Sequence, residues 1–338
     1  MEVLQSTYSS LCLKRLHDMV DKTKHYTALV GVELSGSRLD QALPALFPEF
    51  SRTRLQGWIR EGRVSRDGEE VRRPREKLFG GEAIVLDAQL DDQVENQPQA
   101  IPLRILFQDE AILGVDKPAG LVVHPAAGNR DGTLQNALLH HDPELAKLPR
   151  AGIVHRLDKD TSGLLVVART PAAHKSLVAQ LQARTVKREY LAVVSGIPTA
   201  GGRVNQPIGR HPVHRTRMAV VPLGKSAATN YRVLERFRAH SLLRVNLETG
   251  RTHQIRVHMA HIRHPLVGDP TYAGRLKLPA GVTPELQALL REFNRQALHA
   301  RRLGILHPVY GEAMEWASEP PADMQQLLLL LRKDLTSE

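Results

Sequence analysis

The 338-residue sequence predicts an α+β protein whose larger domain has a mixed, mostly antiparallel central sheet with flanking helices. From residue 101 onward, short apolar segments that favour strands alternate with amphipathic segments that favour helices. Ahead of this region, two helix-like segments and a hairpin signal predict a separate small domain. A chain of this length can bury a sizeable core in one of two domains.

Shifts in composition predict the domain boundaries. We expect an N-terminal extension that can be disordered, a small domain, a polar and acidic linker, and the larger domain. In that order, these segments cover residues 1–34, 35–86, 87–100 and 101–338.

The small domain shows clear local signals. Its second helix is expected to begin after Ser51 as N-cap and to end at Gly62, with Trp58 on its apolar face. Asp67 and Gly68 then form a hairpin turn signal between two short strands. The sequence therefore predicts a helix–helix–hairpin module.

In the larger domain, start and stop signals mark several elements. Thr170 followed by Pro171 predicts the N-terminus of an amphipathic helix, and a later helix is expected to start at Thr252. The run "MQQLLLLLRKDL" predicts a terminal helix. Strands are predicted for the segments "GLLVVART", "REYLAVVSG" and "SLLRVNLE".

The formal net charge of +10 and an isoelectric point near 9.9 favour polyanionic partners such as nucleic acid. No Asp or Glu occurs between Tyr190 and Leu234, which is typical of a surface that binds phosphates, although a solvated basic loop is the alternative. The arginines expected to bind a phosphate backbone are Arg210, Arg215 and Arg217 in this stretch, and Arg52 and Arg54 in the small domain.

Composition also bears on the compartment. The single cysteine, Cys12, excludes an intramolecular disulfide and fits a reducing environment. No stretch approaches the roughly 20 apolar residues that span a bilayer, and the N-terminus lacks the apolar core of a secretory signal. We therefore expect a cytoplasmic protein without a membrane partner.

The segment "HRLDKDTSG", residues 155–163, places charged side chains directly before an apolar strand, which makes the loop a rigid platform. Asp158 and Asp160 could bind Mg²⁺, one of them could act as a nucleophile or base, or both could be structural partners of Arg156 and Lys159. The flanking cations would repel a divalent ion, and the histidines lack zinc-binding spacing. No metal site is expected.

The larger segment "AGIVHRLDKDTSGLLVVART" resembles the signature loop of the RluA-type family of pseudouridine synthases. The segments "KREYLAVVSG", "LETGRTHQIRVHMAHIRHPLVGDPTYAG" and "RQALHARRLGILHP" are similar to later motifs of that family and occur in the same order. This resemblance runs from Ile101 to Asp323. Around "SRTRLQGWIREGRV", the small domain resembles the S4 RNA-binding domain. The resemblance implies a pseudouridine synthase catalytic domain behind an S4-like domain.

The resemblance also implies roles for individual residues. Asp158 matches the essential aspartate, Tyr190 matches the tyrosine that lies against the target base, and Arg256 matches the basic residue paired with the aspartate. Arg251 is the nearby alternative to Arg256. Arg156 matches the residue that occupies the space left by the flipped nucleotide.

Pseudouridine formation breaks the bond between uracil N1 and sugar C1′ and rejoins the ring through C5, so no cofactor is expected. The aspartate could attack C1′ or remove the C2′ proton, and the sequence leaves both routes open. A buried carboxylate needs a nearby arginine to stay charged. The uridine must also leave the helix stack to be reached.

The resemblance further implies that the partner is large-subunit (23S) ribosomal RNA or its assembly intermediate, with the helix 69 stem-loop as the target. We expect the protein to be a monomer. One alternative is an RNA-binding ribosome-assembly protein with little catalytic role, and another is a synthase for a different RNA. A metal-dependent hydrolase using Asp158 and Asp160 is a third.

Overall fold

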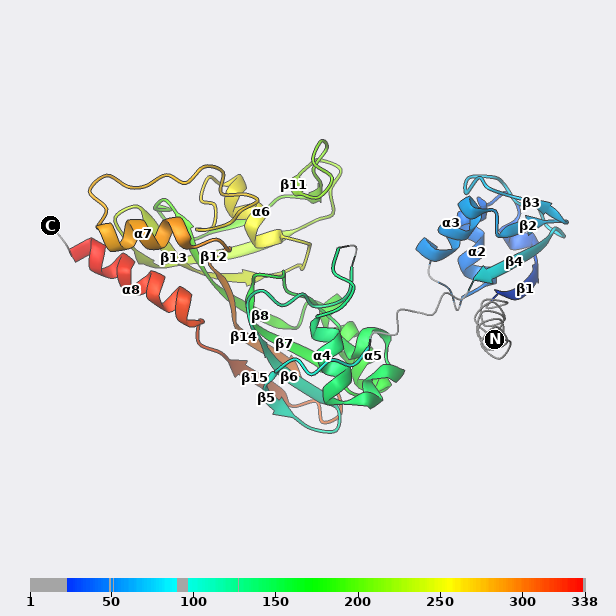
Figure 1. Cartoon of the computed structure of the whole chain (residues 1–338), viewed down its shortest axis with the longest axis horizontal. Helices are drawn as coiled ribbons and strands as arrows, with labels where there is room; N and C mark the ends of the chain where they lie inside the picture. Colours follow the sequence, from blue (N-terminus) through cyan, green and yellow to red (C-terminus); the bar gives the residue numbers. More distant parts are fainter. Residues whose placement is uncertain (1–22, 49, 51, 90–96, 127, 337–338) are drawn as a thin grey trace, which may run out of the picture. The chain divides into compact units, whose positions relative to one another are not determined.

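The structure, a computed structural model, divides into two compact units, Met1–Glu95 and Asn96–Glu338 (Figure 1). This division falls within the predicted linker. Each unit has its own hydrophobic core and is described by itself. The residues that the structure describes are 23–48, 50, 52–89, 97–126 and 128–336.

The first unit packs two helices against a four-stranded antiparallel sheet of order β1-β4-β2-β3. Leucines of both helices and of β4 share one buried core. The elements are β1 (Thr23–Leu29), η1 (Val32–Leu34), α2 (Leu39–Leu46), α3 (Arg52–Glu61), β2 (Val64–Arg66), β3 (Glu69–Glu70) and β4 (Ala83–Gln89).

Two predicted boundaries of this unit are wrong. β1 pairs along its whole length with β4, from Thr23 opposite Gln89 to Leu29 opposite Ala83. The folded unit therefore begins inside the predicted extension, and β4 runs into the predicted linker. The pairing joins residues about sixty positions apart, so neither strand's local sequence reveals it. Residues 1–22 lie outside the described residues.

The local predictions for α3 and the hairpin are confirmed. Trp58 is buried on the core face of α3, and Gly62 adopts a φ of +78° directly after the helix. Asp67 and Gly68 have φ values of +49° and +85°, as the two central residues of a tight hairpin turn require. The predicted N-cap, Ser51, lies outside the described residues.

The second unit is built on a nine-stranded sheet of order β5-β6-β7-β14-β8-β13-β12-β9, with β15 paired to β14. Only β7 and β14 pair in parallel, which confirms the predicted mixed, mostly antiparallel sheet. β10 and β11 form a separate ribbon. The strands are β5 (Arg104–Gln108), β6 (Ile112–Lys117), β7 (Ser162–Ala168), β8 (Lys187–Ser195), β9 (Gly202–Asn205), β10 (Ile208–Arg210), β11 (Met218–Val220), β12 (Ala228–Arg236), β13 (His240–Leu247), β14 (Leu298–Leu306) and β15 (Ala313–Ala317).

Some helices of this unit, α4 and α5 among them, begin at side-chain caps. The Thr170 side chain accepts a hydrogen bond from the Ala173 N–H, as predicted. One predicted start is wrong: the helix expected from Thr252 begins at Gln254, because His253 adopts a left-handed φ of +55°. The helices are α4 (Leu134–His141), η2 (Pro143–Lys147), η3 (Pro149–Gly152), α5 (Pro171–Gln182), α6 (Gln254–His261), α7 (Pro284–Glu292) and α8 (Ala322–Thr336).

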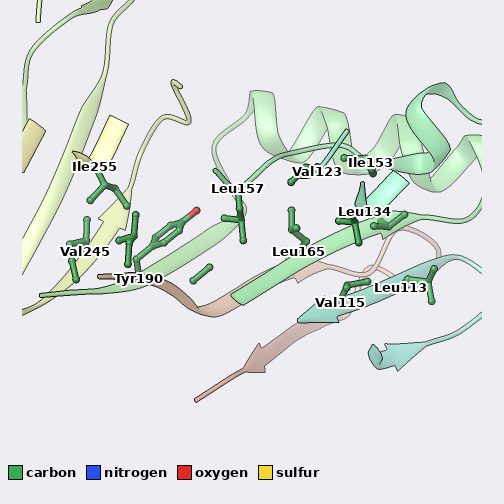
Figure 2. Packing of buried hydrophobic residues seen from close by; sticks show 14 of the residues in the cluster. Leu113, Val115, Val123, Leu134, Ile153, Leu157, Leu165, Tyr190, Val245 and Ile255 are labelled. Atoms are coloured by element: carbon green, nitrogen blue, oxygen red, sulfur yellow. The ribbon is translucent and has the colours of Figure 1, made fainter. Parts of the chain in front are cut away.

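β8 separates two parts of the core. Leu191 and Val193 pack with residues of α7 and α8 on one face of the sheet. Tyr190 and alternate residues after it face the other way, into the cluster that also contains Leu157 and Ile255 (Figure 2). The alternation of β8 thus delivers Tyr190 to the face of the sheet that carries the charged loop.

β7 and β14 approach each other closely at the start of β7, where Gly163 pairs with Ala300. A Cβ at Gly163 would lie 2.3 Å from the Ala300 carbonyl oxygen, and its φ is +111°. This glycine therefore lets the two central strands meet directly behind the charged loop.

We expect Gly163→Ala to lower the free energy of unfolding of the second unit by about 3 kcal/mol, since the new Cβ would meet rigid backbone in a strained conformation. Urea unfolding followed by the fluorescence of Trp316 measures this change. The reference protein and the Gly163→Ala variant both carry Trp58→Phe, so that the tryptophan fluorescence comes only from the second unit.

Gly311 provides the matched control, because its φ is +72° but nothing lies within 4 Å of its added Cβ. Gly311→Ala should cost only about 1 kcal/mol, the penalty of the left-handed backbone alone. Equal costs for the two variants would contradict the importance of the close approach to Ala300.

Candidate active site

The charged loop, residues 155–161, is held in place by its own backbone and by the core. Leu157 is buried in the main hydrophobic cluster. The Thr161 N–H donates to the Asp158 carbonyl at 3.1 Å, which closes a turn around the second half of the loop. The Gln296 side chain donates to the Thr161 hydroxyl at 3.0 Å. The loop is thus the rigid platform that its sequence predicts.

A fully buried lysine at the end of β6 supports the loop from below. The Lys117 ammonium donates to the carbonyl oxygens of Pro118, Leu121 and Lys159 at 2.8–2.9 Å. Burial lowers the pKa of Lys117 to about 7, against the opposing charge of Asp160. The sequence alone does not single out this residue, because a lysine in "DKPAG" is typical of an ordinary turn.

The predicted partners Asp158 and Arg256 meet. The Arg256 Nη1 donates to Asp158 Oδ2 at 3.2 Å, and Arg256 is only 5% exposed. The other edge of its guanidinium donates to Asp269, with Nε–Oδ2 at 2.7 Å and Nη2–Oδ1 at 2.9 Å. Arg256 thus joins two carboxylates, one at the cavity and one entirely buried.

Asp269 is the residue that sequence reasoning missed most directly. It also accepts hydrogen bonds from the N–H groups of Thr271 and Tyr272, so its position is fixed by the chain that follows it. Burial alone would lower the pKa of Arg256, but Asp269 and then Asp158 raise it above its usual value. Arg256 is therefore a permanent cation.

Arg251, the alternative to Arg256, does not contact Asp158. Its side chain is exposed, and its Nε donates to the Ser226 carbonyl at 3.2 Å. Its backbone N–H donates to Gln254, which in turn donates to β12. Arg251 lies at the rim of the same cavity, where it can contact a ligand but not the aspartate.

His253, which contacts Tyr272, lies close to the second oxygen of Asp158, and the sequence did not predict this arrangement. His253 Nε2 lies 4.0 Å from Asp158 Oδ1, while its Nδ1 lies 2.8 Å from the Tyr272 hydroxyl. That hydroxyl accepts the Met218 N–H, so its own proton can be donated to His253 Nδ1. The remaining ring N–H of a neutral His253 then faces the aspartate.

Tyr190 is 6% exposed and lies on β8 between Val245 and Ala300 of the neighbouring strands. Its side chain borders the same cavity as Asp158. Burial raises the pKa of Tyr190, and the charge of Asp158 adds to this effect while Arg188 opposes it. Tyr190 is therefore a neutral phenol at physiological pH.

These groups border one open cavity of about 710 Å³. The predicted residues Asp158, Tyr190, Arg256, Arg156 and Arg251 all line it. Three further arginines of the lining were not predicted, although Arg188 belongs to the segment "KREYLAVVSG". They are Arg150, Arg184 and Arg188.

The other predicted phosphate-binding arginines do not line this cavity. Arg210, Arg215 and Arg217 are exposed on and between β10 and β11, a ribbon joined to the site through the Met218–Tyr272 hydrogen bond. The remaining two belong to α3 of the first unit. Arg52 donates to Asp40, and Arg54 lies over the Trp58 ring.

Metal ligation finds no support in the geometry of the described residues. No group of three or more His, Cys, Asp or Glu side chains there is close enough to hold an ion. Asp158 is bound by Arg256, and His258 is buried with hydrogen bonds to Thr229 and Gln206.

Within the described ranges, no helix is long and apolar enough to cross a membrane.

A carboxylate paired with arginine, in a cavity lined by further arginines, suits an enzyme that acts on a polyanion. The family model described as RNA pseudouridylate synthase matches residues 111–261. Ribosomal large subunit pseudouridine synthase D of Pseudomonas aeruginosa is 58% identical over 319 residues, covering 94% of this chain and 98% of the relative. The protein of the same name from Escherichia coli K12 is 54% identical over 308 residues, covering 91% and 94%.

Solved structures agree with this assignment. Human RNA Pseudouridylate Synthase Domain Containing 4 matches with a TM-score of 0.55 and 26% identity, covering 68% of this chain and 92% of that one. Human RNA Pseudouridylate Synthase Domain Containing 1 matches with a TM-score of 0.52 and 27% identity, covering 69% and 96%. The chain belongs to the RluA-type pseudouridine synthases and is an RNA pseudouridine synthase.

We expect Asp269→Asn to lower kcat by about tenfold to a hundredfold with little change in RNA affinity, because Arg256 would lose the charge that orients it. Single-turnover assays and RNA-binding titrations on the same variant measure the two effects separately.

Glu235→Gln is the matched control, since Glu235 also binds an arginine through both oxygens but does so with Arg332 on the surface. It should leave kcat unchanged. If both variants lost activity equally, the loss would reflect general destabilisation rather than the position of Arg256.

Proposed function

We propose that the protein converts specific uridines of large-subunit (23S) ribosomal RNA to pseudouridine, with the helix 69 stem-loop as its target. The observation that carries the chemistry is the Arg256–Asp158 pair in a cavity bordered by Tyr190. The proposed substrate is supported by the printed names of relatives more than 50% identical along almost the whole chain.

Asp158 is the proposed catalytic group. Since Arg256 binds Oδ2, the other oxygen is the one available to the sugar of the target nucleotide. It attacks C1′ to form an ester, or removes the C2′ proton to form a glycal, and in either case the N1–C1′ bond breaks and uracil leaves the sugar. Rotation of the ring and bond formation between C5 and C1′ follow, and the C5 proton is lost while N1 gains one. When the ring rejoins, the ester is displaced or the proton returns to C2′, so that Asp158 is regenerated. The reaction is an isomerisation, so the proposal includes no cofactor.

Tyr190 is proposed to lie against the flipped base. A neutral phenol gives an apolar ring face with a polar edge, which suits a uracil that must turn during the reaction. Its raised pKa supports this role over that of an ionised base. His253 is proposed to position Asp158, because its free ring nitrogen points at the reactive oxygen.

Base flipping leaves a gap in the RNA that must be stabilised. We propose that Arg156, exposed on the catalytic loop two residues before Asp158, occupies this gap. Arg251 contributes to RNA binding at the rim of the cavity.

The ribbon formed by β10 and β11 and the first unit are proposed to bind further RNA segments. The exposed Arg210, Arg215 and Arg217 supply phosphate contacts on the ribbon. The first unit, with its two helices and hairpin, is proposed to be the S4-like domain, with Arg52 and Arg54 on α3 towards RNA. A ribosomal RNA substrate also supports a cytoplasmic location.

Asp158→Asn is expected to fold and to bind RNA but to lose detectable turnover, since an amide can neither attack the sugar nor remove its proton. Carbodiimide labelling and primer extension on large-subunit RNA measure the product. Stops in helix 69 with the wild type alone are the expected result.

Asp160→Asn is the internal control, because Asp160 lies in the same loop without contacting Arg256. It should retain most of the activity. Full activity of Asp158→Asn would exclude the proposed role, and stops only outside helix 69 would exclude the proposed target.

We also propose that the protein is monomeric, since one chain supplies every group in the proposed mechanism. Light scattering at micromolar concentration should give the mass of a single chain, 37.6 kDa. A stable dimer would contradict this expectation.

A further inference from the structure

We propose that Arg184 and Arg188 bind a phosphate of the RNA strand where it passes from the active-site cavity into a second cavity. This second cavity would hold a nucleotide next to the flipped uridine. This inference rests on the proposed function only for the sequence of the RNA. The charges and the geometry of Arg184 and Arg188 apply to any RNA that enters the active site.

The second cavity, of about 370 Å³, adjoins the active site. It is formed by the start of β8, the end of β13 and parts of β14 and β15. Its volume is within the range of sites that hold a small ligand group. Four residues line both cavities and therefore form the boundary between them: Arg184, Arg188, Leu247 and Glu248.

The carboxylates at this boundary already have partners. Glu248 binds Arg203 through both oxygens, at 2.7 and 2.9 Å, and accepts a further hydrogen bond from Asn230. In the second cavity, Glu189 lies 3.5 Å from Arg244, and Glu315 accepts a hydrogen bond from Arg302. These acids are therefore neutralised by other arginines.

Arg184 and Arg188 make no such direct contact, although the charge of Arg184 contributes to the lowered pKa of Glu248. Among the described residues, neither side chain makes a hydrogen bond or an ion pair, and the buried Nε of Arg188 has no acceptor. An unpaired buried N–H costs free energy unless a ligand satisfies it. Gly250 leaves room for the Arg188 guanidinium, because a Cβ there would lie 2.7 Å from Nη1.

The backbone of Arg184 provides independent support. Arg184 is the residue that ends α5 in a Schellman motif: its N–H donates to the Leu181 carbonyl, and the Thr185 N–H donates to the Gln180 carbonyl. Its φ is +62°, a left-handed conformation that favours glycine. This helix end thus fixes the backbone from which the positively charged Arg184 side chain extends beside the active-site cavity.

A phosphate is the ligand that fits these features. Two guanidinium groups present several N–H donors, and neither group is bound by a carboxylate in an ion pair among the described residues. The polyanion that must enter the adjoining cavity is RNA, so the nearest phosphates flank the target uridine. The strand would leave the active site across Arg184 and Arg188, with its next base in the second cavity.

Arg263 offers a closely matched control. It ends α6 in the same Schellman motif, with its N–H donating to Ala260 and the His264 N–H donating to Met259. Its φ is +66° and its side chain is exposed, but it lines neither cavity. Arg263→Gly therefore makes the same chemical change in the same backbone setting without touching the proposed site.

The experiment compares Arg184→Gly and Arg263→Gly in the full-length protein. Both should keep a melting temperature close to that of the wild type, because glycine relieves the left-handed strain while it adds entropy to the unfolded chain. Affinity for a synthetic RNA with the helix 69 sequence is measured by fluorescence anisotropy at several KCl concentrations.

Arg184→Gly should bind this RNA roughly tenfold more weakly, as expected for the loss of one charge-assisted contact. The slope of log affinity against log salt should fall by about 0.7, corresponding to one phosphate contact. KM should rise with little change in kcat. Arg263→Gly should match the wild type, and Arg188→Gln should weaken binding in the same direction as Arg184→Gly.

Equal affinities and equal salt slopes for Arg184→Gly and Arg263→Gly would overturn the proposal. If the wild type binds helix 69 RNA without modifying it, the proposed target is wrong, and the same pair is compared on the RNA that is modified. The proposal would then still require a weaker salt dependence for Arg184→Gly alone.

Discussion

Arg256 lies between two carboxylates, and the chemistry of this protein depends on that arrangement. Asp269, fully buried, binds the Nε and Nη2 edge of the guanidinium, and Nη1 donates to Asp158. Burying an arginine is favourable only when its charge and its donors are satisfied, so the buried pair fixes the cation before any substrate binds. Asp158 thereby keeps one oxygen bound and one oxygen available. The proposed reactive group, Asp158, is thus oriented by the protein itself.

Other parts of the fold position the loop that carries Asp158. Lys117 donates to a carbonyl of the catalytic loop from below, and Gly163 lets β7 and β14 meet directly behind it. β8 then places Tyr190 across the cavity. Each contact acts on backbone or on buried groups, which move little on ligand binding. The arrangement suits the proposed reaction, in which an extruded nucleotide must meet a site that is already formed.

Positive charge is distributed in two ways on the second unit. The arginines around the ribbon of β10 and β11 are exposed and suit long-range attraction of a polyanion. The arginines that line the cavity include Arg184 and Arg188, which make no hydrogen bond or ion pair among the described residues. Different arginines thus suit the long-range attraction of RNA and its positioning in the cavity. This explains why the basic run in the sequence indicated only the arginines of the ribbon.

The sequence by itself determined the elements, and the proposed reactive residues, that have strong local signals. Alternating apolar residues predicted β8 with Tyr190, the cap at Thr170 predicted α5, and the loop motif identified Asp158. Only the tertiary structure revealed β1, Asp269, His253 and the cavity-lining Arg184 and Arg188. The physical reason is the same in each case. A strand that is completed by a distant strand, or a side chain whose role depends on which charges surround it, has no signal in its own neighbourhood of the chain, because the interaction that defines it forms only when the chain has folded.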